Sequence, residues 1–218
     1  ALLEAVRGQT PERQLRLFAV SCCRRVGRFI SDDRSRNVLE VAERFAEGRV
    51  SAQELATARV GVLFGAAWLA AEPDAWQAAT ESAQAAARAV AREAARAAAT
   101  AAAQRKVLEE ERWRARDTAW FEALHAEQAE QCRLLRCLFG PGGNAAVQPD
   151  PDWLAWGDRT VSRLAQAILD EGEFSHLPIL ADALEEAGCS DQEILGHLRG
   201  PGPHARGCWA IDLLLARE

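Results

Sequence analysis

Two cysteines and two histidines lie close together near the end of the chain. They are Cys189, His197, His204 and Cys208. Zinc takes thiolate sulfur and imidazole nitrogen as tetrahedral ligands, and the three residues between His204 and Cys208 give a usable chelating spacing. This stretch is therefore the first place where metal chemistry would be expected.

Helix geometry limits which of these four residues can share one ion. If residues 190–198 are helical, Cys189 and His197 lie about 12 Å apart, at a rise of about 1.5 Å per residue, which is too far for two ligands. The remaining set is His197, His204 and Cys208, with a fourth position open to water or to an acidic residue. The alternative is a pair of structural histidines with a buried thiol at a helix junction. We prefer that alternative, so no cofactor is expected and zinc is kept as an option.

The same residues allow a second chemistry, that of a thiol nucleophile. Cys208 would sit in the first turn of the last helix, where the helix dipole lowers the pKa of a thiol. Arg206 and His204 are close enough in sequence to stabilise a thiolate or accept its proton, and Asp212 could orient or oppose it. No oxyanion-hole motif accompanies them. His204 and Cys208 are therefore catalytic candidates only, and the expectation leans away from an enzyme.

The turn GPGPHARGCW, residues 200–209, connects these groups. It contains neither GxxxxGK(S/T) nor GxGxxG, and its two prolines lack a backbone donor, so it is not a phosphate-binding loop. We expect a rigid turn between two helices that serves as a packing or partner-recognition point. The binding candidates around it are Arg199, His204, Arg206 and Trp209, with the arginines as surface charges or anion contacts.

The six cysteines contain no CxxC pair and no regular spacing, which favours reduced thiols in a cytoplasmic setting. Cys132 and Cys137, five residues apart, point to different sides of a helix and are excluded as a chelating pair. No basic region followed by an apolar run opens the sequence, so no secretory signal is expected. Four charged residues interrupt the alanine-rich stretch 85–103, which excludes a membrane span.

Two arginine stripes are expected on helix surfaces. Their members are Arg13, Arg24 and Arg28 in one stripe and Arg88, Arg92 and Arg96 in the other. The formal charge of the chain is −6, and aromatic stacking residues do not interleave with the arginines on these helix faces. Solvated faces, or pairing with the chain's own acidic segments, are therefore expected in preference to nucleic-acid binding.

No segment alternates apolar and polar residues as a strand would, so the predicted fold class is all-α. The N-terminal three-helix unit is expected to have helices over 11–30, 33–47 and 51–71. Thr10 and Pro11 open the first of them, and the capping box Ser51–Glu54 opens the third.

Residues 74–138 contain neither glycine nor proline and are dominated by helix-forming residues. They predict either one very long helix, close to about 100 Å, or an antiparallel helical hairpin. Alanine buries little surface, so Trp113 and Trp120 are expected to be anchors in the core rather than cofactor contacts.

Glycine and proline cluster in residues 140–152, which predicts a linker between a domain over 1–139 and a C-terminal domain over 153–218. The C-terminal domain is expected to be a four-helix unit. Its predicted helices cover 158–171, 176–187, 191–199 and 206–217. A second capping box, Ser190–Glu193, is expected to open the third of them.

Residues 153–218, with their GPGPHARGCW run, resemble the C-terminal signature of a family of uncharacterised planctomycete proteins. Residues 15–48, LRLFAVSCCRRVGRFISDDRSRNVLEVAERFAEG, resemble the start of the same family. Within the C-terminal part, ILADALEEAG is similar to the helix-turn of the short repeat-companion domain of those bacteria. The resemblance implies a helical fold and an intracellular location, and it implies no activity.

Every strong signal in this sequence is a folding signal. The preferred hypothesis is a non-catalytic intracellular helical interaction or scaffold module, with a protein partner or self-association. The first alternative is a metal-binding or Cys/His-dependent enzyme centred on His197, His204 and Cys208. The second alternative is nucleic-acid binding through the arginine stripes.

Overall fold

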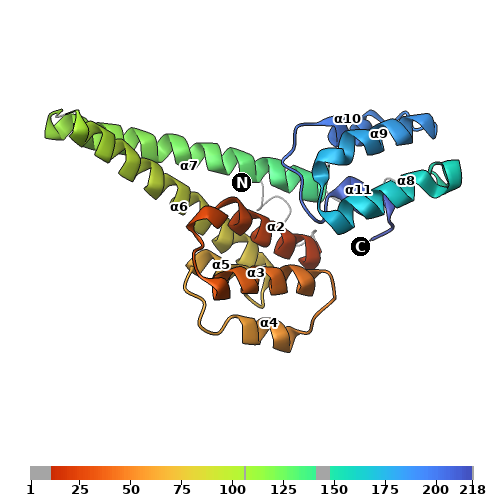
Figure 1. Ribbon diagram of the computed structural model, residues 1–218, viewed down its shortest axis with the longest axis horizontal. Helices are drawn as coiled ribbons and strands as arrows, with labels where there is room; N and C mark the ends of the chain where they lie inside the picture. Colours follow the sequence, from red (N-terminus) through yellow and green to blue (C-terminus); the bar gives the residue numbers. More distant parts are fainter. Residues whose placement is uncertain (1–10, 106, 141–147, 218) are drawn as a thin grey trace. The chain divides into compact units, whose positions relative to one another are not determined.

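The computed structural model describes residues 11–105, 107–140 and 148–217 of this protein. Within those residues the secondary structure is helical throughout, with no strand, and this confirms the predicted all-α class (Figure 1). No helix among them is both long and apolar enough to cross a membrane. The elements in chain order are α2 (Glu12–Arg25), the 3₁₀ helix η1 (Gly27–Phe29), α3 (Asp33–Ala46), α4 (Ala52–Ala58), α5 (Gly65–Ala70), α6 (Ala75–Gln104), α7 (Glu109–Phe139), α8 (Pro151–Glu171), the 3₁₀ helix η2 (Phe174–His176), α9 (Leu177–Glu186), α10 (Gln192–Arg199) and α11 (Trp209–Leu214).

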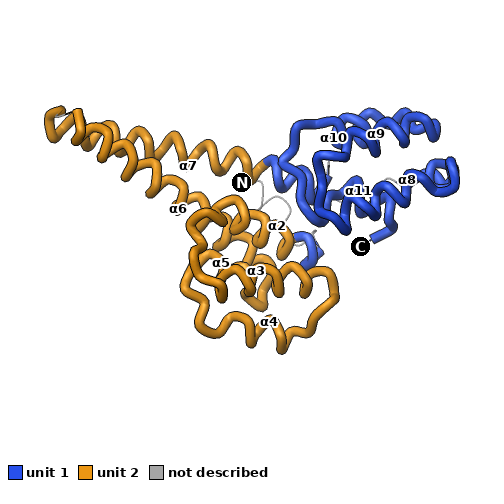
Figure 2. Tube along the Cα trace, viewed as in Figure 1, with its two compact units in different colours: residues 1–14, 133–218 blue, residues 15–132 orange. Residues whose placement is uncertain are grey.

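The chain forms two compact units (Figure 2). Unit 1 comprises Ala1–Gln14 and Arg133–Glu218, and unit 2 comprises Leu15–Cys132. Helices α2 and α7 therefore each contribute residues to both units. Most of the predicted linker, residues 141–147, lies outside the described residues, so a domain boundary at 140–152 stays a prediction.

The predicted third helix, over residues 51–71, is wrong. The Ser51–Glu54 capping box forms, but α4 ends at Ala58 and α5 begins only at Gly65. The backbone N–H groups of Leu63 and Phe64 donate to the Ser35 hydroxyl at 3.2 and 2.9 Å, which draws the intervening segment onto α3. A tertiary hydrogen bond therefore interrupts a sequence whose local signals favour a continuous helix.

Two other boundaries differ from the predicted ones. The first helix ends at Arg25, five residues early, and continues only as η1, while the predicted opening residue Thr10 lies outside the described residues. Helix α10 is capped by Asp191, whose carboxylate accepts from Glu193 N at 2.8 Å, so the predicted Ser190–Glu193 box is wrong. Either residue has a suitable capping side chain, and sequence does not distinguish them.

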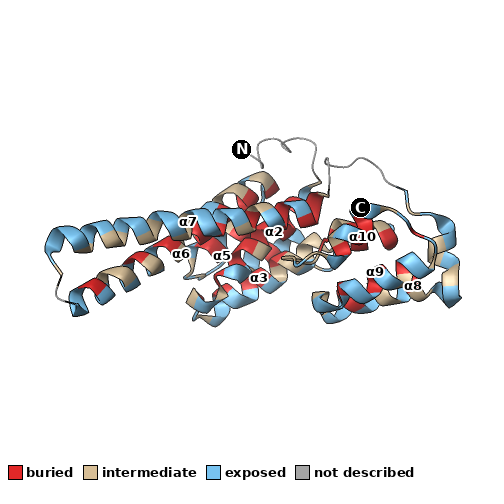
Figure 3. Ribbon diagram, turned by 90° about the horizontal axis from the view of Figure 1, so that it is seen from above, coloured by how far each residue is buried: buried red, intermediate tan, exposed pale blue. Residues whose placement is uncertain are grey.

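Residues 74–138 form a hairpin, in which α6 and α7 run side by side in opposite directions (Figures 1 and 3). The Gln131 amide of α7 donates to Ala83 O of α6 at 3.0 Å. A stripe of small residues is buried along α6: Ala78, Ala79, Ser82, Ala83, Ala86, Ala87, Ala91 and Ala95. Such small side chains let the neighbouring helix approach closely without bulky partners.

The expectation of a tryptophan core is wrong. The Trp113 side chain is half-exposed and Trp120 is only partly buried, while Phe121 on the same helix is exposed. The large hydrophobic residues of α7 that are buried lie near its C-terminal end and are Leu134, Leu135, Leu138 and Phe139.

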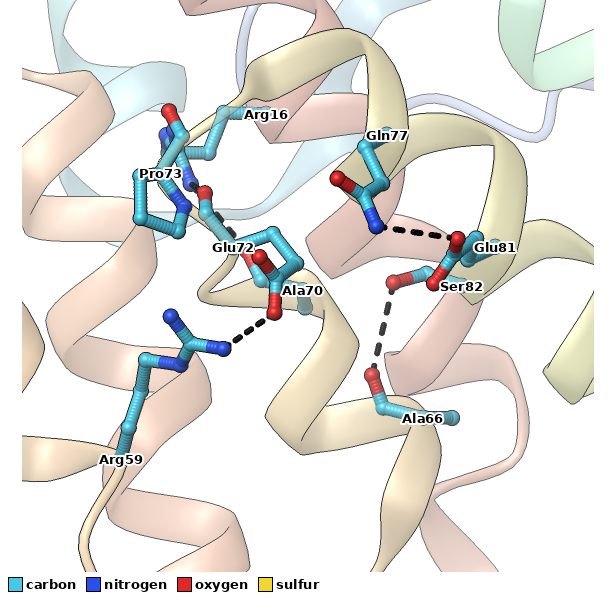
Figure 4. A network of polar contacts seen from close by, with 9 residues as sticks. All are labelled: Arg16, Arg59, Ala66, Ala70, Glu72, Pro73, Gln77, Glu81 and Ser82. Carbon is cyan, nitrogen blue, oxygen red and sulfur yellow. Dashed lines mark hydrogen bonds and ion pairs between the residues drawn. The ribbon is translucent and has the colours of Figure 1, made fainter.

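A buried arginine holds the turn between α5 and α6 in unit 2 (Figure 4). The Arg16 guanidinium donates to Ala70 O at 3.4 Å, to Glu72 O at 2.6 Å and to Pro73 O at 3.0 Å. These carbonyls lie at and just beyond the C-terminal end of α5, where a positive charge is favourable and where helices leave acceptors without donors. The Glu72 carboxylate pairs with Arg59.

Unit 1 packs α8, α9, α10 and α11 around one apolar core that includes Val161, Leu180, Leu198 and Ile211. The backbone of α8 is non-helical over 156–159, so its second regular part, 160–171, matches the predicted helix over 158–171 except for the first two residues. The last helix is shorter than the predicted one over 206–217, because Gly207 takes a left-handed φ of +85° and the chain turns there.

We expect Arg16→Met to lower the free energy of unfolding by about 2–4 kcal/mol. A buried acceptor that loses its donor costs about 1–3 kcal/mol, and of the three bonds that Arg16 donates one is buried and two are partly buried, so water can replace part of the loss. The measurement is urea denaturation. Arg24→Met is the matched control on the same helix, because the exposed Arg24–Glu43 pair should contribute less than about 1 kcal/mol. Equal losses in the two variants would contradict this role for Arg16.

The buried thiol of Cys23 predicts a loss of stability at alkaline pH. Burial, opposed by a hydrogen bond with Ser82, raises the pKa of Cys23 from 9.0 to about 12, and its Sγ donates to Ala66 O at 3.1 Å. The folded state therefore holds this proton more tightly than the unfolded state does. The contribution is fully present below pH 9.0 and declines by up to about 1.4 kcal/mol per pH unit as the pH rises toward 12.

The measurement is urea denaturation at a series of pH values from about 8 to about 11. The alkaline slope of Cys23→Ala should be shallower than that of the wild type, whereas Cys132→Ala, which removes a half-buried thiol, should keep the wild-type slope. The chain has no tyrosine to titrate in this range. Identical slopes for the wild type and Cys23→Ala would refute the prediction.

Candidate metal centre

Four side chains of unit 1 bring their ligand atoms together. They are Cys137 near the end of α7, His197 on α10, His204 in the following turn and Cys208 directly before α11, and their ligand atoms all lie within 4.8 Å of one another. Zinc–ligand bonds of about 2.0–2.3 Å would place tetrahedral ligand atoms about 3.3–3.8 Å apart. The widest separation in the cluster would therefore have to shrink by about 1–1.5 Å to hold such an ion.

His197 contributes its Nε2 atom, which lies 3.2 Å from Cys208 Sγ. Helix α10 positions this ring because Ile194 and Leu198 fix the neighbouring helix face in the core of unit 1. The His197 ring meets the His204 ring edge-on at 4.9 Å and packs against Trp209 at 5.4 Å between ring centroids. These contacts leave the imidazole little freedom to turn away from the sulfur.

His204 contributes its Nδ1 atom, which lies 3.7 Å from Cys137 Sγ. Its other nitrogen, Nε2, lies 3.2 Å from Gly200 O, and a carbonyl oxygen only accepts, so Nε2 carries the hydrogen. In the neutral ring Nδ1 is then an acceptor that faces the sulfur. Metal-binding histidines are commonly held in the ligating tautomer by a hydrogen bond of this kind, from the other ring nitrogen to a backbone carbonyl.

The two thiols of the cluster have opposite pKa shifts. A hydrogen bond from Cys137, followed by bonds with His197 and His204, lowers the pKa of Cys208 well below its ordinary value despite burial. The same bond, together with burial, raises the pKa of Cys137 well above its ordinary value. Burial disfavours a charged His204, but its bonds with Cys208 and Gly200 outweigh this, and the pKa of His204 is raised. The cluster thus favours a thiolate at Cys208, the ionised form that ligates metals.

The three residues predicted from their spacing meet, and a fourth, unpredicted ligand completes the set. His197, His204 and Cys208 come together as the sequence suggested, and Cys189 lies outside the cluster. The position left to water or an acid is taken by Cys137. Sequence reasoning missed it because Cys137 lies 60 residues before His197, and no local spacing relates them.

The other candidate residues have partners within unit 1. Arg199 pairs with Asp182 at 2.7 Å and with Glu185 at 2.6 Å. Arg206 donates to Asp170 O at 3.3 Å. The guanidinium of Arg199 is therefore engaged by two carboxylates rather than presented to an external anion.

Asp212 does not orient Cys208, since its carboxylate is bound elsewhere. It pairs with Arg13 at 2.7 Å, and this pair fixes the first turn of α2 against α11. A cavity of about 210 Å³ beside the cluster is lined by Cys137, His197 and His204, but Cys208 is not among its lining residues. With Cys208 only 1% exposed, the geometry favours ligation by its sulfur over attack on a substrate.

Comparison with protein-family models, with curated proteins and with solved structures finds no match to this chain. The resemblance to planctomycete proteins therefore stays a prediction. What the cluster can do must be argued from its own geometry.

Two glycines beside the cluster give a matched test of how the turn positions His204. Gly202 has a φ of +79°, and a Cβ there would come within 3.0 Å of the His204 ring and backbone. Gly196, in α10, has nothing within 4 Å of such a Cβ. Gly202→Ala should destabilise by about 1–2 kcal/mol from backbone strain alone, whereas Gly196→Ala should stabilise by about 0.5–1 kcal/mol.

Chemical denaturation measures both effects, and the NMR signals of the His204 ring report its displacement. Only the Gly202 variant should shift those signals. A Gly202→Ala protein with wild-type stability and an unmoved His204 ring would show that this turn does not position the ligand.

Proposed function

We propose that this protein is a helical scaffold whose C-terminal unit is stabilised by a structural zinc ion. The ligands would be Cys137 Sγ, His197 Nε2, His204 Nδ1 and Cys208 Sγ. The observation that carries the proposal is the convergence of these four atoms within 4.8 Å from three helix ends and one turn. Such a convergence of two sulfurs and two imidazoles is not needed to fill an apolar core.

The ligand types support zinc over the other common ions. Magnesium and calcium prefer oxygen ligands, and no carboxylate belongs to the cluster. Two thiolates and two imidazoles are a standard tetrahedral set for structural zinc, and the two thiolates neutralise its charge. A neutral complex suits this site because Cys137 and Cys208 are buried.

Four protein ligands leave a tetrahedral ion without an open position, which supports a structural rather than a catalytic metal. The ion would tie the turn after α10 to the end of α7 and to the start of α11. Since Cys137 and His197 are 60 residues apart, this link closes a long loop of the chain. The proposed role of the ion is therefore to make the C-terminal unit rigid, so that its surface can bind a partner.

Elemental analysis of untagged protein, purified without chelator, should find near-stoichiometric zinc. Cys137→Ser and Cys208→Ser should each lose it, while Cys132→Ser, the same substitution five residues earlier on α7, should retain it. Zinc at about 1,000 times its Kd should stabilise the folded protein by about 4 kcal/mol, and neither Ser variant should gain this increment.

Two results would overturn the proposal. One is a wild-type protein without metal that remains metal-free when refolded with zinc. The other is rapid alkylation of Cys208 in the native, zinc-treated protein, because a ligating and buried sulfur should be protected. The second result would point instead to a reactive thiol.

A further inference from the structure

The α6–α7 hairpin of unit 2 carries a groove that the zinc proposal does not use. Its volume is about 570 Å³, and both helices line it. Helix α6 contributes Arg92 and Arg96 with alanine between them, and α7 contributes Arg116, Trp120 and Phe121. The groove thus combines a small-residue floor, an aromatic wall and three guanidinium groups.

The positive charge of this groove is poorly neutralised. In the part of the chain that the structure describes, no carboxylate pairs with Arg92 or Arg96. Arg116 stacks on the Trp113 ring at 3.7 Å and reaches Asp117, the one carboxylate of the groove, at 3.3 Å. Three cations against one anion favour an acidic occupant.

The start of α7, at the tip of the same hairpin, is acidic and apolar and so complements the positively charged groove. Leu108 is 73% exposed, and the acidic residues Glu109, Glu110 and Glu111 follow it at the start of α7. Among the residues that the structure describes, Glu109 pairs with Arg112 and Glu110 with Arg114, and both pairs are exposed and lie within α7. Exposed pairs of this kind contribute little and are readily exchanged for other partners.

The acidic end and the groove lie on one face of α7. Glu109, Trp113, Arg116 and Trp120 are separated by four, three and four residues, the spacing that keeps side chains on one helix face. Trp113 stands three residues from Glu110 and three from Arg116, and its side chain is half-exposed. A two-fold axis through Trp113 would place Glu110 of each copy opposite Arg116 of the other.

We propose that two copies of this chain associate through antiparallel hairpins. The segment Leu108–Glu110 of each copy would occupy the groove of the other, and Trp113 would meet its counterpart at the two-fold axis. A surface that carries both complementary parts on one face forms a closed, isologous dimer. Such a dimer would cover the exposed Leu108, Trp113 and Phe121 together.

Sedimentation equilibrium on the full chain tests this proposal through charge reversal. The groove variant is Arg92→Glu with Arg96→Glu, and the end variant is Glu109→Arg with Glu110→Arg. Each should weaken dimerisation at least tenfold, and the variant that combines all four substitutions should recover most of the wild-type affinity. Glu122→Arg, an exposed change on α7 outside the groove lining, is the control and should leave the affinity unchanged.

A further variant, Trp113→Ala, should weaken dimerisation more than tenfold without loss of helicity by circular dichroism. A wild-type chain that stays monomeric at all concentrations overturns the proposal, as does a folded combined variant that fails to recover. Salt-dependent binding of a single-stranded oligonucleotide, lost in the groove variant while self-association is not, would assign the groove to nucleic acid instead.

Discussion

The convergence of two thiols and two imidazoles in unit 1 imposes the strictest constraint in this molecule. A buried polar group must find a partner, and here each of the four finds it in another member of the cluster or in Gly200 O. To satisfy all four at once, the end of α7, helix α10 and the start of α11 must meet at one point. Apolar contacts in the core around Leu180 and Ile211 are non-directional, whereas the cluster requires four particular atoms to meet.

Buried charges elsewhere obey the same rule. Arg16 is held by backbone carbonyls at the end of α5, and Asp212 by the guanidinium of Arg13. In both cases a charge that would be costly alone links segments far apart in sequence, 54 or more residues in the first case and 199 in the second. The cost of burying an unpaired charge therefore makes each of these contacts specific to one arrangement of its unit.

The hairpin of α6 and α7 depends on small apolar side chains rather than on buried charges. The buried face of α6 is made of small side chains, and the Gln131 amide of α7 donates to Ala83 O on this helix. Of the aromatic residues of α7, Trp120 and Phe121 line the groove beside Arg92 and Arg96. In sequence these aromatic residues are more than 20 residues from Arg92 and Arg96. The sequence therefore did not indicate that the hairpin brings them together.

Local signals in the sequence determined most of the helices. The Ser51–Glu54 box and Asp32 cap the helices they precede, and the long stretch without glycine or proline is helical on both sides of its turn. Spacing alone also brought His197, His204 and Cys208 into one candidate site. These features depend on periodicity, capping and chain geometry within about ten residues. Patterns of that length can be identified in the sequence alone.

Only the tertiary structure decided the break between α4 and α5, the hairpin over 74–138 and the fourth member of the cluster. Each depends on a partner distant in sequence: Ser35 for the break, the alanines of α6 for the hairpin, and the end of α7 for Cys137. The free energy of such contacts comes from groups whose separation in the chain is unrelated to their separation in space. Local pattern therefore gave the helices, and long-range packing gave the site.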